Sequence, residues 1–431
     1  MVEAQDYIEI PQSGPVNATV QPPGSKSITN RALICAALAE GPSLLTGALD
    51  SEDTQVMVRA LQSLGIAVRH DPQQRQIMVE GRGGEIPARQ ADLYLANSGT
   101  SLRFLTAFCT LGDGLFRLDG VARMRERPIQ ELVDALNRLG AKVRTELATG
   151  CPPVIVEAHG LPGGETEISG EISSQFLSGL LMAAPYARSH VTLIVRGDLV
   201  SKPYVEMTLA VMKAFGVQGE NEAFQRLTVR SGQRYHGRTY AIEPDASAAT
   251  YFFAAAAVTR GRITVTGLGQ HSLQGDVHFV DCLKEMGCHV VVDAEQITVE
   301  GRPLKGISVD MNAISDTVPT LGVVALFAEG PTLIRGVKHI RYKETDRIHA
   351  LALELRRLGA QVEEFEDGLK IIPATYHGAE IHTYQDHRMA MSFAIAGLRI
   401  PGTKILDPGC TAKTYPEFFE DLRTIIRPET G

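Results

Sequence analysis

Residues 263–267 read Ile263-Thr264-Val265-Thr266-Gly267, an alternation of apolar and polar side chains that closes on a glycine. Such an alternation predicts a half-buried strand. A short β-like run closes on a glycine at six places along the chain, which are Gly47, Gly120, Gly197, Gly267, Gly336 and Gly409. A polar loop and an amphipathic helix pattern follow each of them, and successive glycines lie roughly 70 to 77 residues apart, which indicates a repeated α/β unit.

A second marker keeps the same period. Five of the amphipathic patterns end in an apolar residue followed by glycine, at Leu64-Gly65, Leu139-Gly140, Phe215-Gly216, Met286-Gly287 and Leu358-Gly359. Glycine after the last apolar turn is a helix C-cap signal, because it adopts the left-handed conformation without strain. The sixth helix is expected over residues 415–425. The sequence therefore predicts six α/β units, with the functional side chains in the loops between strand and helix.

Proline interrupts the pattern at Pro22-Pro23-Gly24 and at Glu243-Pro244-Asp245. The residue before a proline favours extended backbone. We interpret the two interruptions as hinge strands that join two lobes of three units each, although two ordinary loops would give the same signal. One lobe is expected over residues 24–242 and the other over 1–23 plus 243–431, with hinges near 20–24 and 241–245.

The composition excludes several classes of function. The chain has 431 residues with 42 Lys and Arg against 50 Asp and Glu, a net charge of −8, which disfavours binding to nucleic acid or to an anionic membrane. The six cysteines form no CxxC pair, which suits a reducing compartment. The first ten residues do not resemble a signal peptide, and the longest apolar run, 248–258, is too short to span a bilayer. We expect a cytoplasmic protein.

Small polar residues and cations open several helix patterns in the first lobe. Lys26, Ser27 and Arg31 follow Gly24, and Asn97, Gly99 and Thr100 open the next such pattern. Backbone N–H groups at a helix N-terminus bind anions, most naturally phosphate. A capped surface helix is the alternative for the first of these segments.

The next loop carries three alternating cations, Arg123, Arg125 and Arg127, ahead of Pro128, which suits the first turn of a helix. Cations this dense require an anion or an acidic partner, and Glu126 alone is insufficient. Ser173-Ser174-Gln175 and Ser201-Lys202-Pro203-Tyr204 suit recognition of a polyol, although each serine is singly as consistent with a helix N-cap.

Reactive carboxylates are concentrated in the second lobe. Asp316 opens an apolar helix pattern, where it is either a base or an N-cap. The segment Arg341-Tyr342-Lys343-Glu344-Thr345-Asp346-Arg347 places three cations and two carboxylates at one helix start, where a solvated charged face is the alternative. His387-Arg388 and Lys413 complete the set of cations at helix starts. If the lobes face each other across the hinges, these groups converge on one anion-binding cleft.

Taken together, these motifs resemble the 5-enolpyruvylshikimate-3-phosphate synthase family essentially from end to end. The resemblance rests on six segments and the first and last loops, which are Pro23 to Ser27, Asn97 to Thr100, Arg127-Pro128, Ser173 to Gln175, Ser201 to Tyr204, Lys343 to Arg347, Asp386 to Arg388 and Thr411 to Thr414. It implies an α/β enolpyruvyl transferase fold of two lobes, each with three βαββαβ units, joined by two crossover strands. It also implies transfer of the enolpyruvyl group of phosphoenolpyruvate to the 5-hydroxyl of shikimate 3-phosphate, with release of phosphate and with neither metal nor organic cofactor.

The resemblance also implies the site residues. Shikimate 3-phosphate is expected on Lys26, Ser27, Arg31, Ser173, Ser174, Gln175, Ser201, Tyr204, Asp316, His339 and Lys343. Phosphoenolpyruvate is expected on Lys26, Asn97, Gly99, Thr100, Arg127, Gln175, Glu344, Arg347, His387, Arg388 and Lys413. This division suits the chemistry, because guanidinium groups clasp carboxylate and phosphate in bidentate fashion.

Catalysis needs a base near the acceptor hydroxyl and an acid near the enol methylene. By resemblance Asp316 is the base and Glu344 the acid, and Lys26 and Lys413 assist proton transfer and stabilise developing charge. The two carboxylates could also share these roles differently. The family further implies inhibition by glyphosate in competition with phosphoenolpyruvate, and we expect a monomer.

Two positions depart from the usual pattern of the family. His339 replaces a common Asn, and Phe104 replaces a residue that is often Pro. The nearest alternative is the sister transferase that acts on UDP-N-acetylglucosamine, which usually carries a reactive Cys in a mobile loop; residues 113–128 contain none. A DNA clamp is the alternative from another class, but the cations here gather in loops rather than along helix faces.

Overall fold

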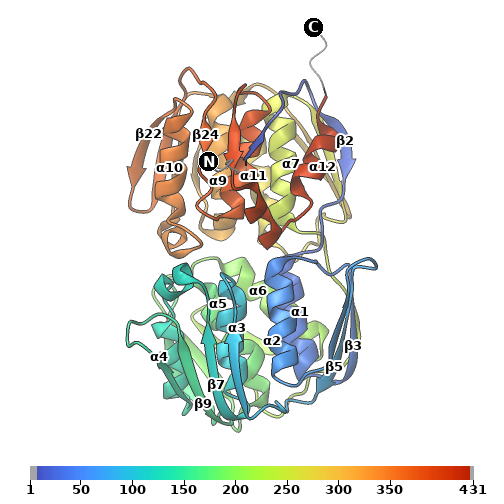
Figure 1. Cartoon of the computed structure of the whole chain (residues 1–431), viewed down its shortest axis with the longest axis vertical. Coiled ribbons are helices and arrows are strands. Elements are labelled where there is room, and N and C mark those ends of the chain that lie inside the picture. Colours follow the sequence, from blue (N-terminus) through green and yellow to red (C-terminus); the bar gives the residue numbers. More distant parts are fainter. Residues whose placement is uncertain (1–6, 428–431) are drawn as a thin grey trace, which may run out of the picture. The chain divides into compact units, whose positions relative to one another are not determined.

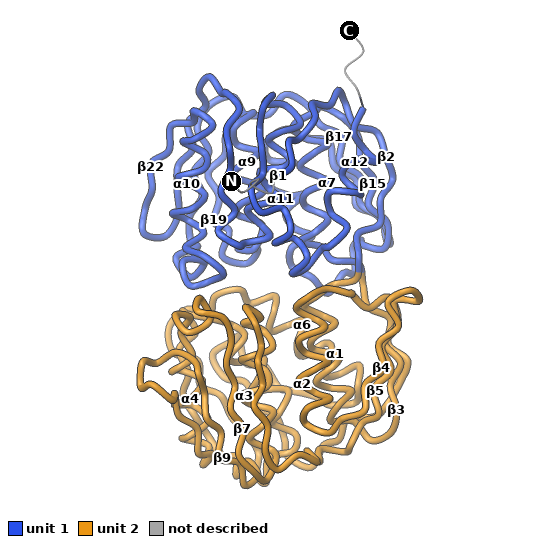
Figure 2. Tube along the Cα trace, in the orientation of Figure 1, with its two compact units in different colours: residues 1–23, 244–431 blue, residues 24–243 orange. Residues whose placement is uncertain are grey.

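The computed structural model describes residues 7–427, shown in Figure 1. The chain forms two compact units, coloured separately in Figure 2: unit 1 comprises Met1–Pro23 and Pro244–Gly431, and unit 2 comprises Gly24–Glu243. The second boundary lies between Glu243 and Pro244, one residue further along than the expected 242/243. Each unit is described by itself below.

Unit 2 contains three four-stranded sheets with one shared strand order. The first sheet has the order β14 (Thr239–Ala241), β3 (Glu40–Thr46), β5 (Gln76–Arg82) and β4 (Val68–Asp71). The second has the order β6 (Gln90–Tyr94), β7 (Asp113–Asp119), β9 (Val154–His159) and β8 (Lys142–Thr145). The third has the order β10 (Gly164–Ser169), β11 (Val191–Arg196), β13 (Arg226–Val229) and β12 (Gly219–Glu222). In each sheet the first two strands are parallel and the others pair antiparallel, so the same supersecondary unit occurs three times.

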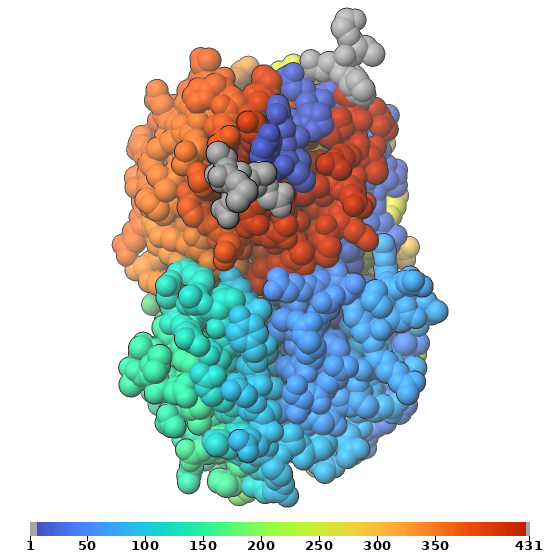
Figure 3. All heavy atoms as spheres, in the orientation of Figure 1, coloured from blue at the N-terminus to red at the C-terminus, as the bar shows by residue number. Residues whose placement is uncertain are grey.

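Unit 1 repeats this order with strands from both ends of the chain. One sheet contains β16 (His289–Val292), β17 (Gln296–Glu300), β15 (Arg262–Thr266) and β2 (Asn17–Val20). Another contains β19 (Ser308–Asp310), β21 (Thr332–Arg335), β23 (Gly368–Ile372) and β22 (Gln361–Phe365). A three-stranded sheet contains β1 (Tyr7–Glu9), β25 (Lys404–Leu406) and β24 (Glu380–Ile381), and β18 (Leu304–Lys305) pairs with β20 (Ala328–Glu329). Figure 3 shows the N-terminal segment lying against the C-terminal part of the chain on this face of unit 1.

The helices form two alternating sets. The amphipathic set follows the marker glycines and comprises α2 (Glu52–Ser63), α4 (Gln130–Arg138), α6 (Lys202–Ala214), α8 (Phe279–Glu285), α10 (Arg347–Arg357) and α12 (Phe418–Ile425). The buried set comprises α1 (Lys26–Leu38), α3 (Gly99–Cys109), α5 (Ser174–Ala183), α7 (Ala246–Thr259), α9 (Val318–Val324) and α11 (His387–Gly397). All residues of α3, α7 and α11 are buried. Because a helix that is apolar all round must be covered on every side, the second set forms the cores of the units.

Short 3₁₀ helices connect these elements, and they are η1 (Ala122–Glu126), η2 (Ala184–Tyr186), η3 (Gly275–His278), η4 (Asn312–Thr317), η5 (Ala325–Phe327), η6 (Lys338–Tyr342) and η7 (Pro408–Lys413). Among residues 7–427, no helix combines the length and apolar character needed to cross a bilayer.

The predicted C-cap glycines are confirmed. Gly65, Gly140, Gly216, Gly287 and Gly359 all have φ between 86° and 117°. Three predictions of detail are wrong. The sixth helix begins at Phe418 instead of 415, because η7 and the turn after it occupy the preceding residues. Gly409 lies inside η7 and does not close a strand, since β25 ends at Leu406. Pro128 precedes α4 by two residues and is not in its first turn.

Candidate active site

Lys26 is the first residue of α1, as the sequence predicts for a helix N-terminus. Ser25 caps this helix by accepting a hydrogen bond from the Ile28 amide at 3.4 Å. The Lys26 ammonium lies 3.7 Å from a carboxylate oxygen of Asp53, and both side chains are almost completely buried. Asp53 holds the cation in place at the helix start. Sequence reasoning missed this carboxylate, which is the second residue of α2.

Arg31 of α1 connects this helix to α5 and α6. Its guanidinium donates to the Thr208 hydroxyl at 2.7 Å and to the Ser178 hydroxyl at 3.2 Å. It also donates to the backbone carbonyls of Ser27 at 2.9 Å and Tyr204 at 3.2 Å. Burial lowers the pKa of Arg31 to about 10, the first of its causes being desolvation. Because every one of these acceptors is neutral, the charge of Arg31 is balanced by dipoles rather than by a carboxylate.

The same contacts explain Phe104. Arg31 lies over the Phe104 ring at 5.2 Å and over the Tyr204 ring at 5.8 Å from the guanidinium carbon to each ring centre. A cation over an aromatic face is attracted by the ring quadrupole. Phe104, one turn after the start of α3, therefore packs the underside of Arg31. The structure thus brings Ser27, Arg31 and Tyr204 together.

Arg103 and Gln175 connect α3 to α5. Arg103 donates to the Gln175 side-chain oxygen at 2.8 Å and to the Pro128 carbonyl at 3.3 Å. Gln175 in turn donates to the Thr100 hydroxyl at 3.2 Å. Arg103 is buried, and the sequence analysis did not include it among the site residues. Its position four residues after Gly99, one helical turn away, is the signal that could have found it.

Gly99 sits beneath two guanidinium groups. Arg127 donates to the backbone and side-chain oxygens of Asn97 at 3.0 and 3.2 Å. A Cβ added at position 99 would lie 2.5 Å from an Arg103 nitrogen and 2.7 Å from the Arg127 guanidinium carbon, and it would contact an Arg127 nitrogen more closely still. Asn97, Gly99, Thr100, Arg127 and Gln175 therefore form one cluster. The absent side chain of Gly99 leaves the space that the two guanidinium groups occupy.

The other two arginines of the 123–127 loop have protein partners. Arg123 pairs with Glu126 at 2.9 Å, and Arg125 pairs with Asp119 at 2.6 Å. Asp119 is a buried carboxylate at the end of β7 that also accepts from Arg117 at 3.0 Å. Acidic side chains, chiefly Asp119, therefore neutralise the positive charges of Arg123 and Arg125. Of the three arginines, Arg127 is the one that lies against Gly99.

Of the three predicted serines, Ser173, Ser174 and Ser201, the first caps a helix and the last does not. Ser173 caps α5 by accepting from the Gln175 amide at 3.3 Å, and Ser174 is buried behind it. Ser201 precedes α6 in the left-handed conformation, with φ 54°, and its hydroxyl does not cap the helix. Residues other than Gly or Asn seldom adopt this backbone conformation. The constrained turn therefore fixes the direction of the Ser201 side chain.

Arg347 is the centre of the unit 1 cluster. Its guanidinium, 2% exposed, donates to Asp386 at 2.7 and 3.3 Å, to Asp316 at 3.0 Å and to Glu344 at 2.7 Å. The pKa of Arg347 is raised: burial acts against the charged form, and the coulombic effects of Asp386, Glu344 and Asp316 outweigh it. The two carboxylates expected to transfer protons thus share one rigid, planar donor. The geometry brings Asp316, Glu344 and Arg347 together.

Two further cations lie on Asp316. Arg388 donates to its second oxygen at 2.9 Å, and the Lys343 ammonium lies 3.6 Å from its first. The Lys413 ammonium lies 4.0 Å from Glu344. Asp316 is the next-to-last residue of η4 and is not the N-cap of α9, because Thr317 takes that position. A carboxylate between three cations is held in one place by their combined hydrogen bonds and charge.

The two histidines of the site are buried and neutral. The His339 ring lies 2.9 Å from the Ser315 hydroxyl, and burial, followed by the charge of Lys343, lowers its pKa to about 3. His387 begins α11, and burial, followed by Arg388, lowers its pKa well below the usual range. Within residues 7–427 neither ring nitrogen of His387 has a hydrogen-bond partner. Both rings therefore offer hydrogen bonds without charge.

Asp386 and Asp276 complete the unit 1 cluster. Asp386 is completely buried, caps α11 by accepting from the Arg388 amide at 2.9 Å, and receives Arg347 on its other side. Asp276, in η3, accepts from the Ser247 hydroxyl, which lies 3.4 Å from Arg388. Burial, and then the charge of Asp316, raises the pKa of Asp276 to about 6. Asp386 belongs to a segment that carries the family resemblance, but the sequence alone assigns it no role. Nothing in the sequence near residue 276 points to the site.

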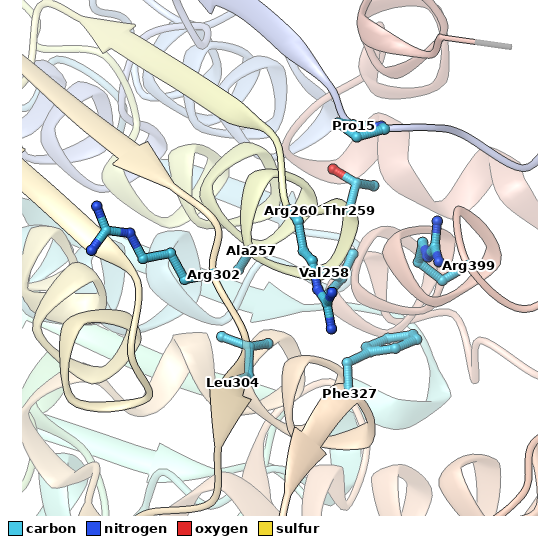
Figure 4. A pocket seen from close by; sticks show the side chains of 9 residues that line it. All are labelled: Pro15, Ala257, Val258, Thr259, Arg260, Arg302, Leu304, Phe327 and Arg399. Atoms are coloured by element: carbon cyan, nitrogen blue, oxygen red, sulfur yellow. The ribbon is translucent and has the colours of Figure 1, made fainter. Parts of the chain in front are cut away.

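A separate cavity of about 380 Å³ lies at the other end of α7, where the helix closes with Val258 and Thr259 (Figure 4). Arg260, Arg302 and Arg399 line it. Figure 4 shows Arg302 directing its guanidinium away from Val258, and that side chain lies 3.6 Å from Glu300. None of the predicted site residues borders this cavity. Among residues 7–427, no group of three or more His, Cys, Asp or Glu is arranged as a metal site.

Comparisons with known proteins give a consistent result. A family model described as EPSP synthase (3-phosphoshikimate 1-carboxyvinyltransferase) matches residues 10–422. A 3-phosphoshikimate 1-carboxyvinyltransferase of Trichormus variabilis is 51% identical over 416 residues, 96% of this chain and 98% of the relative. One of Sulfurovum sp. is 46% identical over 413 residues, 95% of this chain and 97% of the relative.

Solved structures agree with the sequence matches. An EPSP synthase of Acinetobacter baumannii is 27% identical and matches with a TM-score of 0.82 over 98% of both chains. The enolpyruvyl transferase NikO of Streptomyces tendae, at 22% identity and a TM-score of 0.77 over 97% of both chains, shares the fold. The predicted α/β enolpyruvyl transferase fold is therefore confirmed, and the chain belongs to the EPSP synthase (3-phosphoshikimate 1-carboxyvinyltransferase) family.

Proposed function

We propose that this protein is a 3-phosphoshikimate 1-carboxyvinyltransferase of the shikimate pathway, which makes aromatic amino acids. It transfers the enolpyruvyl group of phosphoenolpyruvate to the 5-hydroxyl of shikimate 3-phosphate and releases phosphate. The observation that carries the proposal is the placing of Asp316 and Glu344 on two nitrogens of the Arg347 guanidinium. That arrangement supplies two carboxylates, held at a fixed separation, to a reaction that needs one base and one acid.

Shikimate 3-phosphate would be held by hydroxyl, amide and cationic groups. Its ring hydroxyls suit the oxygen and nitrogen atoms of Gln175 and the hydroxyls of Ser173, Ser174, Ser201 and Tyr204. Its phosphate suits the start of α1 with Lys26 and Ser27, and His339 supplies a neutral hydrogen bond where the family commonly has Asn. In this assignment Arg31, buried on neutral acceptors, holds Ser27 and Tyr204 from beneath.

Phosphoenolpyruvate would be held by guanidinium and ammonium groups. Arg127, Arg347, Arg388, Lys26 and Lys413 suit its carboxylate and phosphate. Gly99 lies against Arg127, and the Thr100 hydroxyl accepts from Gln175. His387 has two buried ring nitrogens at the start of α11. The close approach of Gly99 to two guanidinium groups means that a methyl group there would displace them.

The reaction is an addition followed by an elimination. Asp316 removes the proton from the acceptor hydroxyl as its oxygen bonds to C2 of phosphoenolpyruvate, while Glu344 gives a proton to C3, which becomes a methyl group. The C2–O bond to phosphate then breaks, phosphate leaves, and a proton returns from the methyl group to the protein. The product is the enolpyruvyl ether. Lys26 and Lys413 stabilise the charge that develops on the leaving phosphate.

Release of phosphate from phosphoenolpyruvate tests the proposal, with shikimate 3-phosphate and UDP-N-acetylglucosamine as alternative acceptors in parallel reactions. We expect release with the first acceptor and none above background with the second. Release with UDP-N-acetylglucosamine alone would assign the sister activity instead. Omission of each acceptor controls for simple hydrolysis of phosphoenolpyruvate.

Three finer points stay predictions: inhibition by glyphosate in competition with phosphoenolpyruvate, a monomeric state and a cytoplasmic location. The first is tested by the phosphoenolpyruvate dependence of glyphosate inhibition, the second by sedimentation, and the third by cell fractionation.

A further inference from the structure

The segment immediately before the α11 site residues has an unusual backbone. Tyr384 and Gln385 have φ of 56° and 55°, so two consecutive residues other than glycine adopt the left-handed conformation. Side chains with a Cβ are strained there, and such strain persists only where the surroundings fix it. The turn leads directly into Asp386, His387 and Arg388. Its conformation therefore determines how these three residues enter α11.

A buried carboxylate holds this turn. Glu354 of α10 is completely buried, and one of its oxygens accepts from the Tyr384 hydroxyl at 2.7 Å. The other oxygen accepts from the backbone amide of His382 at 3.1 Å and from Arg357 at 3.0 Å. A buried carboxylate is costly unless its oxygens are satisfied. Here two of the three donors come from the turn, whereas the third belongs to Arg357, which is 45% exposed.

The same helix grips the other end of the segment. Arg347, the first residue of α10, donates to both oxygens of Asp386, which is completely buried. Arg347 and Glu354 are seven residues apart and so lie on one face of the helix, two turns from each other. Residues 382–386 are thus clamped at both ends by one rigid element. A change in the turn would disturb the hydrogen bonds between Arg347 and Asp386 or between Arg388 and Asp316.

We propose that Glu354 is a positioning residue that fixes the left-handed turn at Tyr384 and Gln385, and thereby the placement of Asp386 and of the guanidinium groups of Arg347 and Arg388. This inference rests on the proposed function. The Glu354 carboxylate acts two helical turns from Arg347, and it accepts from the Tyr384 hydroxyl and the His382 backbone amide.

Steady-state kinetics of Tyr384→Phe and Glu354→Gln test the inference. Gln offers one acceptor oxygen in place of two, so Glu354→Gln should raise the KM for phosphoenolpyruvate about tenfold, and Tyr384→Phe about threefold. The KM for shikimate 3-phosphate and the kcat at saturation should stay within about twofold of wild type. Tyr376→Phe is the matched control. Among residues 7–427 the Tyr376 hydroxyl accepts a hydrogen bond from the Ala374 backbone amide at 3.1 Å and makes no hydrogen bond with Glu354 or the turn. This variant should leave both KM values unchanged.

Relief of strain gives a second test. Glycine adopts the left-handed conformation freely, so adding Gln385→Gly to Glu354→Gln should recover part of the lost affinity for phosphoenolpyruvate. Binding of inorganic phosphate, measured by calorimetry, should weaken in Tyr384→Phe and Glu354→Gln, and this readout needs no turnover. A wild-type protein that binds phosphate but does not turn over shikimate 3-phosphate would refute the proposed function while leaving this test intact.

Three results would overturn the positioning role: wild-type KM for phosphoenolpyruvate in Tyr384→Phe with unchanged phosphate binding, equal rises of both KM values in Tyr384→Phe, or the same change in Tyr376→Phe. If Glu354→Gln does not fold, Tyr384→Phe decides, since the loss of one hydroxyl leaves the carboxylate with its other two donors.

Discussion

The two units contribute groups of different electrostatic character. In unit 1, carboxylates and cations alternate: Asp316, Glu344 and Asp386 surround Arg347. Lys343 and Arg388 lie against Asp316, and Lys413 lies against Glu344. In unit 2, Arg31 donates to hydroxyls and carbonyls, and Arg103 and Arg127 donate to amide, carboxamide and carbonyl oxygens.

This difference places the two proposed proton-transfer carboxylates in unit 1. Charges that alternate hold carboxylates in fixed positions, as an acid and a base require. The Arg31 guanidinium, on neutral acceptors, keeps its positive charge available to the field of an anionic ligand, at the cost of being buried on dipoles alone. We therefore expect changes at Asp316 and Arg347 of unit 1 to affect the chemical step or stability, and changes at Gly99 of unit 2 to affect binding.

The largest effect is expected for Asp316→Asn. The amide keeps the shape of the side chain but cannot accept the hydroxyl proton, so kcat should fall about 10²- to 10⁴-fold. Phosphate release under saturating substrates measures it. Asp281→Asn, at an exposed residue that pairs with His278, is the control and should keep wild-type kcat. A kcat within threefold of wild type in Asp316→Asn would break the assignment of proton transfer to unit 1.

Replacement of the two buried arginines sharpens the comparison through stability. Arg347→Met leaves three carboxylates without their shared donor and should cost about 3 to 5 kcal/mol of unfolding free energy. Arg31→Met leaves neutral acceptors behind and should cost about 1 to 3 kcal/mol. Urea unfolding followed by circular dichroism measures both. Equal costs would show that the two environments do not differ as described.

His339→Asn tests the neutral histidine of unit 1 through pH. The folded-state pKa of His339, about 3, lies below its usual value near 6.5, so the unfolded chain binds the proton more readily. Wild-type stability should therefore fall as pH drops below about 6.5. The variant lacks this loss and should gain about 2 kcal/mol relative to wild type between pH 7 and pH 5, as measured by unfolding at each pH. A constant difference between the two proteins would contradict the buried neutral ring.

The smallest effect is expected for Gly99→Ala in unit 2. The added methyl would contact the guanidinium groups of Arg103 and Arg127, which must shift. The KM for phosphoenolpyruvate should rise about tenfold, with a larger rise in the inhibition constant for glyphosate, while kcat changes little. Inhibition curves for both proteins provide the measurement. Equal glyphosate inhibition of wild type and variant would count against this geometry.

Sequence periodicity predicted much of the fold, because a strand that ends on glycine and a helix that ends on an apolar residue and glycine are both local patterns. The C-caps at Gly65 and Gly359 depend only on such local preferences. Gly409 shows the limit of the method: the last loop folds into η7, and the glycine there does not end a strand.

The partners of the site residues could not be predicted in the same way. Asp53 pairs with Lys26, and Asp119 pairs with Arg125. The number of residues between the partners does not predict that their side chains lie close together. Asp276 and Glu354 stand in ordinary helical surroundings in the sequence, and only the packing of η3 and α10 gives them a relation to the site. Residues at helix starts were predictable because each follows a recognisable N-terminal signal; residues that hold them were not.

Isotope incorporation tests the central claim most directly. The reaction is run in D₂O with phosphoenolpyruvate and shikimate 3-phosphate, and the product is analysed by mass spectrometry and NMR. If Glu344 protonates C3 and a proton leaves the resulting methyl group, deuterium should appear in the vinyl methylene of the product and should be strongly reduced, together with turnover, in Glu344→Gln. Full turnover with no deuterium at that carbon would contradict proton transfer by the carboxylates of unit 1.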